Sequence, residues 1–515
     1  MRRALPVLLL AVALAVLVRY PSSVDLTATP TDPNTMLHMI AAWDLGHGGS
    51  PTHLPSMGHP EGMQIRMLAL PLLGLAALLD LVADPRAGFH LAVVLWLVAS
   101  GLGVAWVARR LDGNPLVAVA ALLSAPLVVQ ALGNGQYENV VPLAFALALF
   151  AAAADRWWAA LAACLLAGFS TPYQAMAVWV VLMCLVFPRW KPMLAGSVGT
   201  GLAALYYLQV VTDGVDPTAM PAPPMGDQGA SLAELVFGSF FGEDLGAGQR
   251  SWQLLYGAEP RELSLNWPFI RALSQGTLGL GLCLVGGVGL WLRRADPLAR
   301  RLALGAGLCL IAAMGQRLEL APGVSTPIPL PWALSAWIPG IDRMQATPRL
   351  LTAPCFALVI GAAWALKGHR GWLAGLLVIE GLWFAPAWWP APVLSAKPLP
   401  VELPGEGPIA VWPGPPDVMP RYHRIVWLEV QRPLAWYQAQ DWRAELTGAP
   451  EPGKQEIQHA LPTQDLVGRS PQQWLDDAQP DVILEFTGSP DPLKDRGLPL
   501  RELRCEEAWC VYELP

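Results

Sequence analysis

Residues 91–107 read LAVVLWLVASGLGVAWV, a run without a single charge, and Arg109 and Arg110 follow it almost directly. An apolar segment of roughly 17–25 residues can cross the hydrocarbon core of a bilayer as one helix. Basic residues beside such a segment are typical of its cytoplasmic end. This stretch therefore predicts a transmembrane helix that ends in the cytoplasm, and the rest of the chain follows the same pattern.

The composition of the whole chain agrees with this prediction. Of the 515 residues, 54% are hydrophobic and only 14% are charged, and the mean hydropathy is +0.40. Soluble globular chains carry about 25% charged residues. The formal net charge is −7 and the sequence has no Lys/Arg-rich tract, so we expect no nucleic-acid partner. The expected partner is the membrane lipid bilayer.

Further apolar segments bring the expected number of spans to about eleven. The candidate spans are residues 4–20, 89–107, 115–132, 138–154, 157–171, 174–188, 192–211, 274–292, 302–316, 348–366 and 371–389. Basic residues lie between them, at Arg2, Arg3, Arg109, Arg110, Arg156, Arg189, Lys191, Arg293, Arg294, Arg300, Arg301, Lys367 and Arg370. With eleven crossings, all these residues lie on the side of the N-terminus, as the positive-inside rule requires of the cytoplasmic side. We expect a multi-pass protein of the bacterial inner membrane with a cytoplasmic N-terminus.

Two apolar segments allow more than one interpretation. The first, residues 4–20, follows Met-Arg-Arg and fits either a cleaved signal peptide or an anchor; we expect an anchor, because no clear A-x-A cleavage site follows. The second, residues 67–82, is interrupted by Pro71 and Asp80. If it crossed the membrane, every later basic cluster would lie outside. We therefore expect a juxtamembrane or re-entrant helix within an outer loop, residues 21–88; the alternative is an ordinary span with the charge rule failing downstream.

The composition changes after the last candidate span, where the chain becomes rich in Pro, Glu, Asp and Gln. Strand-like runs occupy residues 409–412, 425–428 and 482–486, and a hairpin is expected over 501–512. Cys505 and Cys510 flank its turn and could form a bridge in an oxidising compartment. We predict a mainly α fold: a transmembrane helix bundle over residues 1–389, with a second large outer loop at 212–273, and a small extracytoplasmic α/β domain over 390–515.

The first outer loop is the richest in polar residues. Asp32, Asp44 and Glu61 are its candidate carboxylates, and residues 34–45 predict a short amphipathic helix. Asp32 could act as a general base on an acceptor hydroxyl. The alternative is that Asp32 caps this helix, with Pro33 at the first helical position. The loop also carries four histidines: His38, His47, His53 and His59. Their spacing matches no familiar metal site and favours solvated side chains.

Two outer turns carry hydrogen-bonding side chains. Residues 133–139 read GNGQYEN, with polar groups at Asn134, Gln136, Tyr137, Glu138 and Asn139. Such a set suits a sugar or a lipid head group. The alternative is a glycine-rich turn whose polar groups face water. The next outer turn, residues 170–174, adds Tyr173, whose ring is also typical of a membrane interface.

Arg343 and Arg349 lie at the outer end of a late span, against the charge bias of the chain. Arginine can bind a phosphate in a bidentate manner, so these two are the best phosphate-binding candidates. The alternatives are pairing with Asp342 or snorkelling to the surface. The sequence shows no P-loop and no GxGxxG, GxSxG or HExxH motif, which disfavours chemistry on soluble nucleotides.

In the order and spacing of its short motifs, the chain resembles the GT-C superfamily of integral-membrane glycosyltransferases, especially its bacterial members. The motifs are Asp32-Pro33, Trp43-Asp44, His59-Pro60-Glu61-Gly62, Ala108-Arg109-Arg110-Leu111, residues 133–139, residues 170–173, Arg343 and Pro348-Arg349. This resemblance covers most of residues 1–390. The chain departs from the family in having Pro33 where many members have a second acidic residue. It also has Gly133-Asn134-Gly135-Gln136, without a histidine, where related sequences show a Gly-His-x-Asn turn.

The resemblance implies a donor sugar carried on polyprenyl phosphate and an extracytoplasmic glycan, lipid or protein acceptor. It implies Asp32, and second Asp44, as the base or acceptor-orienting residue, and Arg343 or Arg349 as the phosphate contact. His59 and Glu61 join the set of substrate-binding candidates. Some members need a divalent metal, and the residues leave the cofactor open.

Two other functions fit the sequence. A transporter or flippase for a lipid-linked glycan needs polar groups at mid-membrane depth, and Glu380 is the clearest charged residue inside a candidate span. A non-catalytic assembly protein would bind partners through the C-terminal domain, where tryptophans are frequent: Trp412, Trp427, Trp436 and Trp474.

Overall fold

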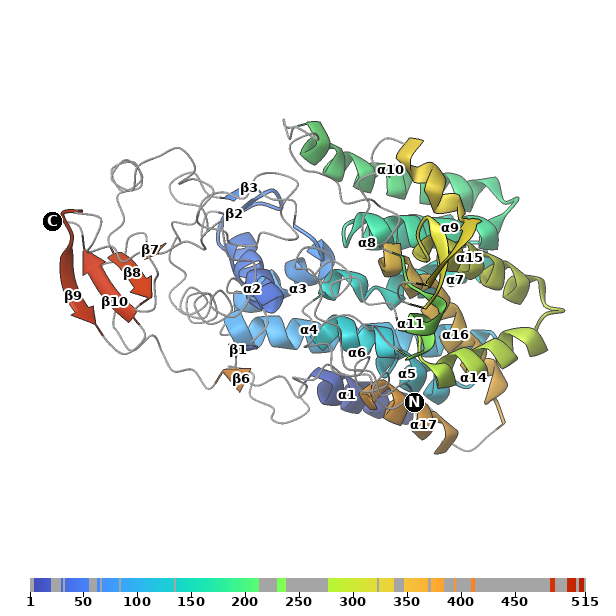
Figure 1. Ribbon diagram of the computed structural model, residues 1–515. Helices are drawn as coiled ribbons and strands as arrows, with labels where there is room; N and C mark the ends of the chain where they lie inside the picture. Colours follow the sequence, from blue (N-terminus) through green and yellow to red (C-terminus); the bar gives the residue numbers. More distant parts are fainter. Residues whose placement is uncertain are drawn as a thin grey trace.

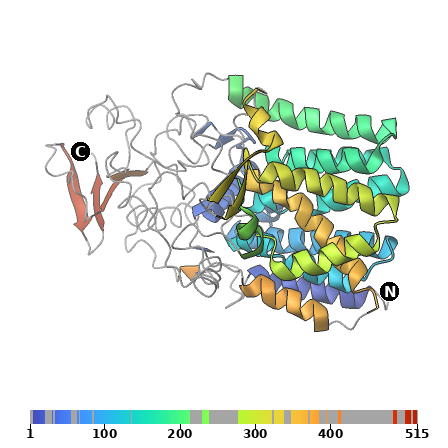
Figure 2. The same ribbon diagram turned by 45° about the vertical axis from the view of Figure 1, so that its right-hand side comes forward.

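The structure of this chain is a computed structural model dominated by helices, most of which lie side by side in one bundle (Figure 1, Figure 2). It describes residues 4–19, 29–30, 33–54, 63–64, 67–82, 85–133, 136–212, 229–237, 277–321, 324–337, 347–368, 372–383, 393–394, 409–412, 482–486, 498–505 and 509–513. The mainly α fold expected from the sequence is confirmed for this part of the chain.

The long helices of the bundle coincide with the candidate spans. They are α1 (Leu5–Arg19), α4 (Pro85–Arg110), α5 (Pro115–Leu123), α6 (Pro126–Gly133), α7 (Pro142–Ala154), α8 (Trp157–Gly168), α9 (Pro172–Val186), α10 (Trp190–Thr212), α14 (Leu280–Leu292), α15 (Pro297–Ala313), α16 (Thr352–Ala365) and α17 (Trp372–Trp383). Short helices are α11 (Leu232–Phe237) and the 3₁₀ turns η1 (Tyr137–Asn139), η3 (Pro331–Trp337) and η4 (Thr347–Leu351). Each predicted span overlaps one helix, or the pair α5 and α6 for residues 115–132.

Three helical segments in the described part of the chain are long and apolar enough to cross a membrane by length and composition. They are Ala87–Arg110, Tyr137–Ala154 and Thr347–Ala365. The bent pair α5 and α6, with 46° between its two halves, is a fourth if it forms one span. Several other apolar helices are shorter. These segments indicate a membrane protein, and the total of about eleven spans stays a prediction.

Exposed apolar side chains follow single faces of the outer helices. On α14 they are Leu280, Leu284, Val288 and Trp291, with 46%, 60%, 51% and 61% of each side chain exposed. The spacing of three or four residues places all of them on one helical face. On α10 the corresponding residues are Leu194, Val198, Leu202 and Leu205. A continuous exposed apolar stripe is costly in water and favourable in lipid, which agrees with a membrane bundle.

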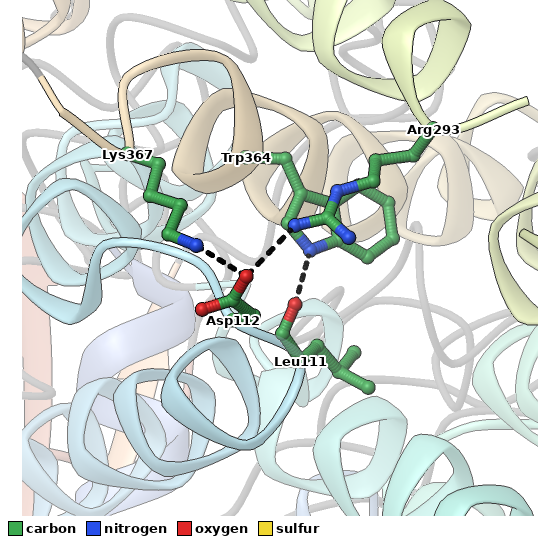
Figure 3. A network of polar contacts seen from close by, with 5 residues as sticks. All are labelled: Leu111, Asp112, Arg293, Trp364 and Lys367. Carbon is green, nitrogen blue, oxygen red and sulfur yellow. Dashed lines mark hydrogen bonds and ion pairs between the residues drawn. The ribbon is translucent and has the colours of Figure 1, made fainter.

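Turns that are far apart in the sequence meet at one end of the bundle, which we name the basic end. Asp112, in the turn between α4 and α5, forms ion pairs with Arg293 after α14 and with Lys367 after α16 (Figure 3). The hydrogen bond from Lys367 and then that from Arg293 lower the pKa of Asp112 below its usual range. Arg189 Nη1 also donates to the Ala152 carbonyl at the end of α7. The turns that carry Arg293 and Lys367 therefore meet at one end of the bundle, and the side of a membrane that this end faces stays a prediction.

The opposite end of the bundle, which we name the α2 end, carries the first loop. The expected helix at 34–45 is present as α2 (Pro33–Gly46), and the apolar segment at 67–82 forms α3 (Leu70–Asp80). The α3 helix begins where the Ala69 N–H donates to the Ser170 carbonyl, and it ends beside Gly88 near the start of α4. Both ends of α3 therefore lie toward the α2 end, which agrees with a juxtamembrane helix and not with a span.

Short strands complete this end. A two-stranded ribbon pairs β2 (His53–Leu54) with β3 (Met63–Gln64), a hairpin pairs β4 (Arg317–Ala321) with β5 (Val324–Pro329), and β1 (Thr29–Pro30) pairs with β6 (Val393–Leu394). The hydroxyl of Tyr206 in α10 lies 2.7 Å from the Pro51 carbonyl oxygen and 3.3 Å from the Met67 carbonyl oxygen. Pro51 precedes β2 and Met67 follows β3, so Tyr206 contacts both ends of the segment that forms this ribbon. The β1–β6 pair joins the segment after α1 to the segment after α17.

The C-terminal strands form a separate sheet in the order β7–β8–β10–β9 (Figure 1). The strands are β7 (Ile409–Trp412), β8 (Val482–Phe486), β9 (Arg501–Cys505) and β10 (Trp509–Glu513). The first two are parallel and the others antiparallel. The strands expected at 409–412 and 482–486 and the hairpin at 501–512 are confirmed, and Cys505 and Cys510 form a disulfide. The strand expected at 425–428 lies outside the described residues.

Glu380 of α17 has a structural partner in the neighbouring helix α14. Its carboxylate accepts hydrogen bonds from the Gly281 N–H at 2.6 Å and the Leu282 N–H at 3.0 Å, in the first turn of α14. These N–H groups have no partner within their own helix, and the helix dipole favours a negative charge there. Glu380 thus caps α14 from another helix.

We therefore predict that Glu380→Ala lowers the free energy of unfolding by about 2 kcal/mol, because two N–H groups lose a charged acceptor. Glu380→Gln keeps one acceptor oxygen and should lose clearly less. Thermal unfolding of the purified protein in detergent measures both. Equal midpoints for wild type and the alanine variant would contradict this role of Glu380.

Candidate functional site

Polar side chains from three separate turns are buried together at the α2 end of the bundle. They come from η1 and the residue before it, from the start of α9, and from η4 with the start of α16. The side chains are Gln136, Glu138, Asn139, Gln174, Arg349 and Thr352, each at most 8% exposed. In an apolar bundle such a cluster is costly unless its members bind one another or a ligand.

Arg349 lies between an acidic and an aromatic side chain. Its Nη1 is 3.8 Å from Oε1 of Glu138, and its guanidinium carbon lies 5.4 Å from the ring centre of Tyr173. The η4 turn that carries Arg349 is held in place by Thr347, whose hydroxyl donates to the Ala313 carbonyl at the end of α15. The positive charge is therefore balanced by a buried carboxylate and by the face of an aromatic ring.

Gln174 joins the three turns. Its Nε2 donates to the Arg349 carbonyl at 3.1 Å and to Oδ1 of Asn139 at 3.4 Å, and its Oε1 accepts from the Thr352 hydroxyl at 2.7 Å. The sequence marked the turn at 170–174 but gave no role to Gln174, and it did not mark Thr352. The sequence does hold one indication of Gln174: it is a polar residue in the first turn of α9, which begins at Pro172 and is otherwise mostly apolar.

A small pocket opens within this cluster. Its lining combines two apolar side chains with amide, hydroxyl and guanidinium groups: Leu127, Ala131, Gln136, Asn139, Arg349 and Thr352. The amides can donate and accept hydrogen bonds, and the guanidinium group can bind an anion. This chemistry suits a single hydroxyl group or a phosphate oxygen.

The first loop lies against this cluster through α2. The rings of His38 and Tyr137 meet edge-on, with centres 5.4 Å apart, and Phe89 of α4 packs on the same tyrosine at 5.5 Å. His38 is thus a packing residue beside the turn at 136–139. Asp44 is fully buried in the last turn of α2, the helix that packs on α3, and it is not among the pocket-lining residues.

The structure brings together Gln136, Glu138, Asn139, Tyr173 and Arg349, which the sequence marked in three unconnected segments. Their contact is a structural finding, and their role in binding a substrate stays a prediction.

The other candidates, Asp32, His59, Glu61, Asn134 and Arg343, lie outside the described residues. For Asp32, His59, Glu61 and Asn134, the structure describes the helices or strands that flank them in the sequence. Asp32 directly precedes α2, His59 and Glu61 lie between β2 and β3, and Asn134 directly follows α6. These flanking elements all belong to the α2 end.

Metal binding finds no support within the described ranges, where no three His, Cys, Asp or Glu side chains are grouped as metal ligands would be. No protein-family model matches this sequence, and no curated protein matches it either. The buried polar cluster is therefore the main observation that bears on function.

Proposed function

We propose that this protein is a membrane glycosyltransferase that moves a sugar from a polyprenyl-phosphate-linked donor to an extracytoplasmic acceptor. The observation that carries the proposal is the pocket at the α2 end, where Arg349 is buried beside Gln136, Asn139 and Thr352. A guanidinium group next to neutral hydrogen-bonding groups fits a sugar phosphate. The boundary of an apolar bundle is where the head group of a lipid-linked donor would arrive.

The proposed topology places the basic end in the cytoplasm and the α2 end outside, in the inner membrane. The positive-inside rule favours this orientation, because basic turns meet at one end of the bundle. The Cys505–Cys510 disulfide supports an extracytoplasmic C-terminal domain, since disulfides persist in oxidising compartments.

In the proposed reaction, Asp32 removes the proton from the acceptor hydroxyl as its oxygen attacks the anomeric carbon of the sugar. The new bond forms between this oxygen and the carbon, and the bond from the carbon to the phosphate oxygen breaks. The phosphate leaves with the electron pair of the broken bond. Arg349, together with Arg343, stabilises the charge that grows on the leaving phosphate. The configuration at the sugar carbon inverts, which needs only one base.

Transport of a lipid-linked glycan has less support. The sequence argument for it was Glu380, and that carboxylate binds the first turn of α14. A charge used to cap a helix is not evidence for a substrate path.

The proposal is tested with the purified protein in lipid vesicles, supplied with radiolabelled polyprenyl-phosphate sugars and a crude envelope extract as the acceptor. We expect sugar transfer by the wild type, and a loss of about 100-fold or more for Asp32→Asn, because a general base contributes roughly 10²–10⁴-fold. Asp25→Asn changes an aspartate in the same loop and should keep full activity. Transfer that is unchanged in Asp32→Asn removes this residue as the base. Movement of intact donor across the vesicle membrane without transfer would favour the transporter.

A further inference from the structure

The three turns that meet at the basic end form a cationic cluster, which has more basic residues than its two ion pairs to Asp112 use. Among the described residues at or beside these turns, five are basic, Arg109, Arg110, Arg293, Arg294 and Lys367, and two are acidic, Asp112 and Asp296. Arg293 and Lys367 both bind Oδ2 of Asp112, as Figure 3 shows. Asp296 accepts from the Leu298 N–H at the start of α15 and is used as a helix cap. The cluster therefore keeps a net positive charge.

The cations of this cluster lie at the end of an apolar stripe. On α14, the exposed residues Leu284, Val288 and Trp291 form one face that leads to the turn with Arg293 and Arg294. The guanidinium carbon of Arg294 is 4.1 Å from the ring centre of Trp291. An exposed apolar face that ends in a tryptophan and two arginines matches an acyl chain joined to an anionic head group.

We infer that this cationic cluster binds the phosphate head group of an anionic phospholipid, such as phosphatidylglycerol. The acyl chain of the lipid lies along the exposed face of α14. Charge complementarity favours an anionic lipid over a zwitterionic one. Continuity with the apolar stripe favours a lipid over a soluble phosphate. This binding site lies at the end of the bundle away from Arg349 and does not depend on the proposed transferase activity.

The site is tested by titrating dioleoyl phosphatidylglycerol into the detergent-solubilised full chain and counting bound lipids by native mass spectrometry. We expect phosphatidylglycerol to bind at least tenfold more tightly than dioleoyl phosphatidylcholine. The double variant Arg294→Gln/Lys367→Gln should weaken phosphatidylglycerol binding by on the order of tenfold, since each basic residue near a lipid surface contributes about a fivefold effect. The matched control Arg156→Gln/Lys191→Gln removes two exposed charges from other turns of the same end and should change binding less than twofold.

A further variant separates lipid binding from structural support. Asp112→Asn removes the negative charge and keeps a residue type that tolerates the positive φ of 61° at this position. It should bind phosphatidylglycerol more tightly than wild type, although it weakens the contact between the three turns. Weaker binding in Asp112→Asn would overturn the proposal. Equal losses in the site and control doubles, or displacement of the lipid by millimolar inorganic phosphate, would also overturn it.

Discussion

The Glu138→Gln variant is expected to lose about 3 kcal/mol of unfolding free energy. Glu138 and Arg349 are 4% and 5% exposed, so replacing the carboxylate by a neutral amide removes a negative charge from beside a buried guanidinium group. Breaking a buried pair from one side typically costs roughly 3–5 kcal/mol, whereas replacing both partners by neutral groups of similar size is often neutral. The double variant Glu138→Gln/Arg349→Met should therefore recover most of the lost stability.

The pair between Arg189 and Asp155 is a suitable control for this experiment. Its N–O distance of 3.7 Å is nearly the same as the 3.8 Å of the buried pair, but its side chains are 45% and 69% exposed. Exposed pairs contribute roughly 0–1 kcal/mol, so Asp155→Asn should change the unfolding midpoint little. Thermal unfolding of the wild type, Glu138→Gln, Arg349→Met and the double variant in one detergent gives the coupling energy of the buried pair. Simple addition of the two single effects in the double variant would show that the two charges are not coupled.

The same variants separate stability from function. If Arg349 binds the leaving phosphate, Glu138→Gln/Arg349→Met is a stable protein without sugar transfer. A purely structural role of the pair predicts that activity returns together with stability. Transfer rates and unfolding midpoints measured on one preparation decide between these outcomes.

The sequence predicted the helices better than their ends. Apolar runs located a helix at each candidate span, but six of the helices, α4, α5, α6, α7, α9 and α15, begin at prolines, which are well suited to the first helical position. The span expected to begin at residue 302 begins at Pro297, where Asp296 caps the helix. Arg300 and Arg301 were expected to precede this span, and in the structure they lie within the first turns of α15. The span expected at 138–154 starts as the 3₁₀ turn η1, and its α-helix begins at Pro142.

The site was predictable only in pieces. Glu138 and Arg349 could be picked out from the sequence, because charged residues are rare in this apolar chain and both lie in outer turns. Their contact depends on how the bundle brings together turns more than 200 residues apart, which local sequence does not contain. Gln174, at the end of the marked turn 170–174, and Thr352 received no role for the same reason: their partners lie far away in the sequence. Glu380 was marked as a membrane charge, and its partner is a backbone N–H 99 residues away.

The Gly289→Leu variant is expected to prevent correct packing of the bundle, whereas Gly287→Leu should fold normally. The two glycines lie two residues apart in α14 and point in different directions. A Cβ atom at position 289 would overlap the carbonyl oxygen of Gly361 in α16, and one at Gly286 would overlap the Leu358 carbonyl. A Cβ atom at Gly287 meets nothing within 4 Å among the described residues.

The clash at Gly289 is with backbone, so no side-chain rotation can relieve it. The α14 and α16 helices would have to move apart, and overpacking of this kind costs roughly 1–3 kcal/mol, or more when the backbone must shift. The Gly287→Leu substitution instead removes a glycine from a helix interior, which stabilises the helix by about 1 kcal/mol through helix propensity. It also extends the exposed apolar face of α14. Yield of monodisperse protein after extraction in mild detergent, together with the unfolding midpoint, measures both effects. Similar behaviour of the two variants would contradict the close crossing of α14 and α16, on which the positions of Glu380 and of the basic turn after α14 both depend.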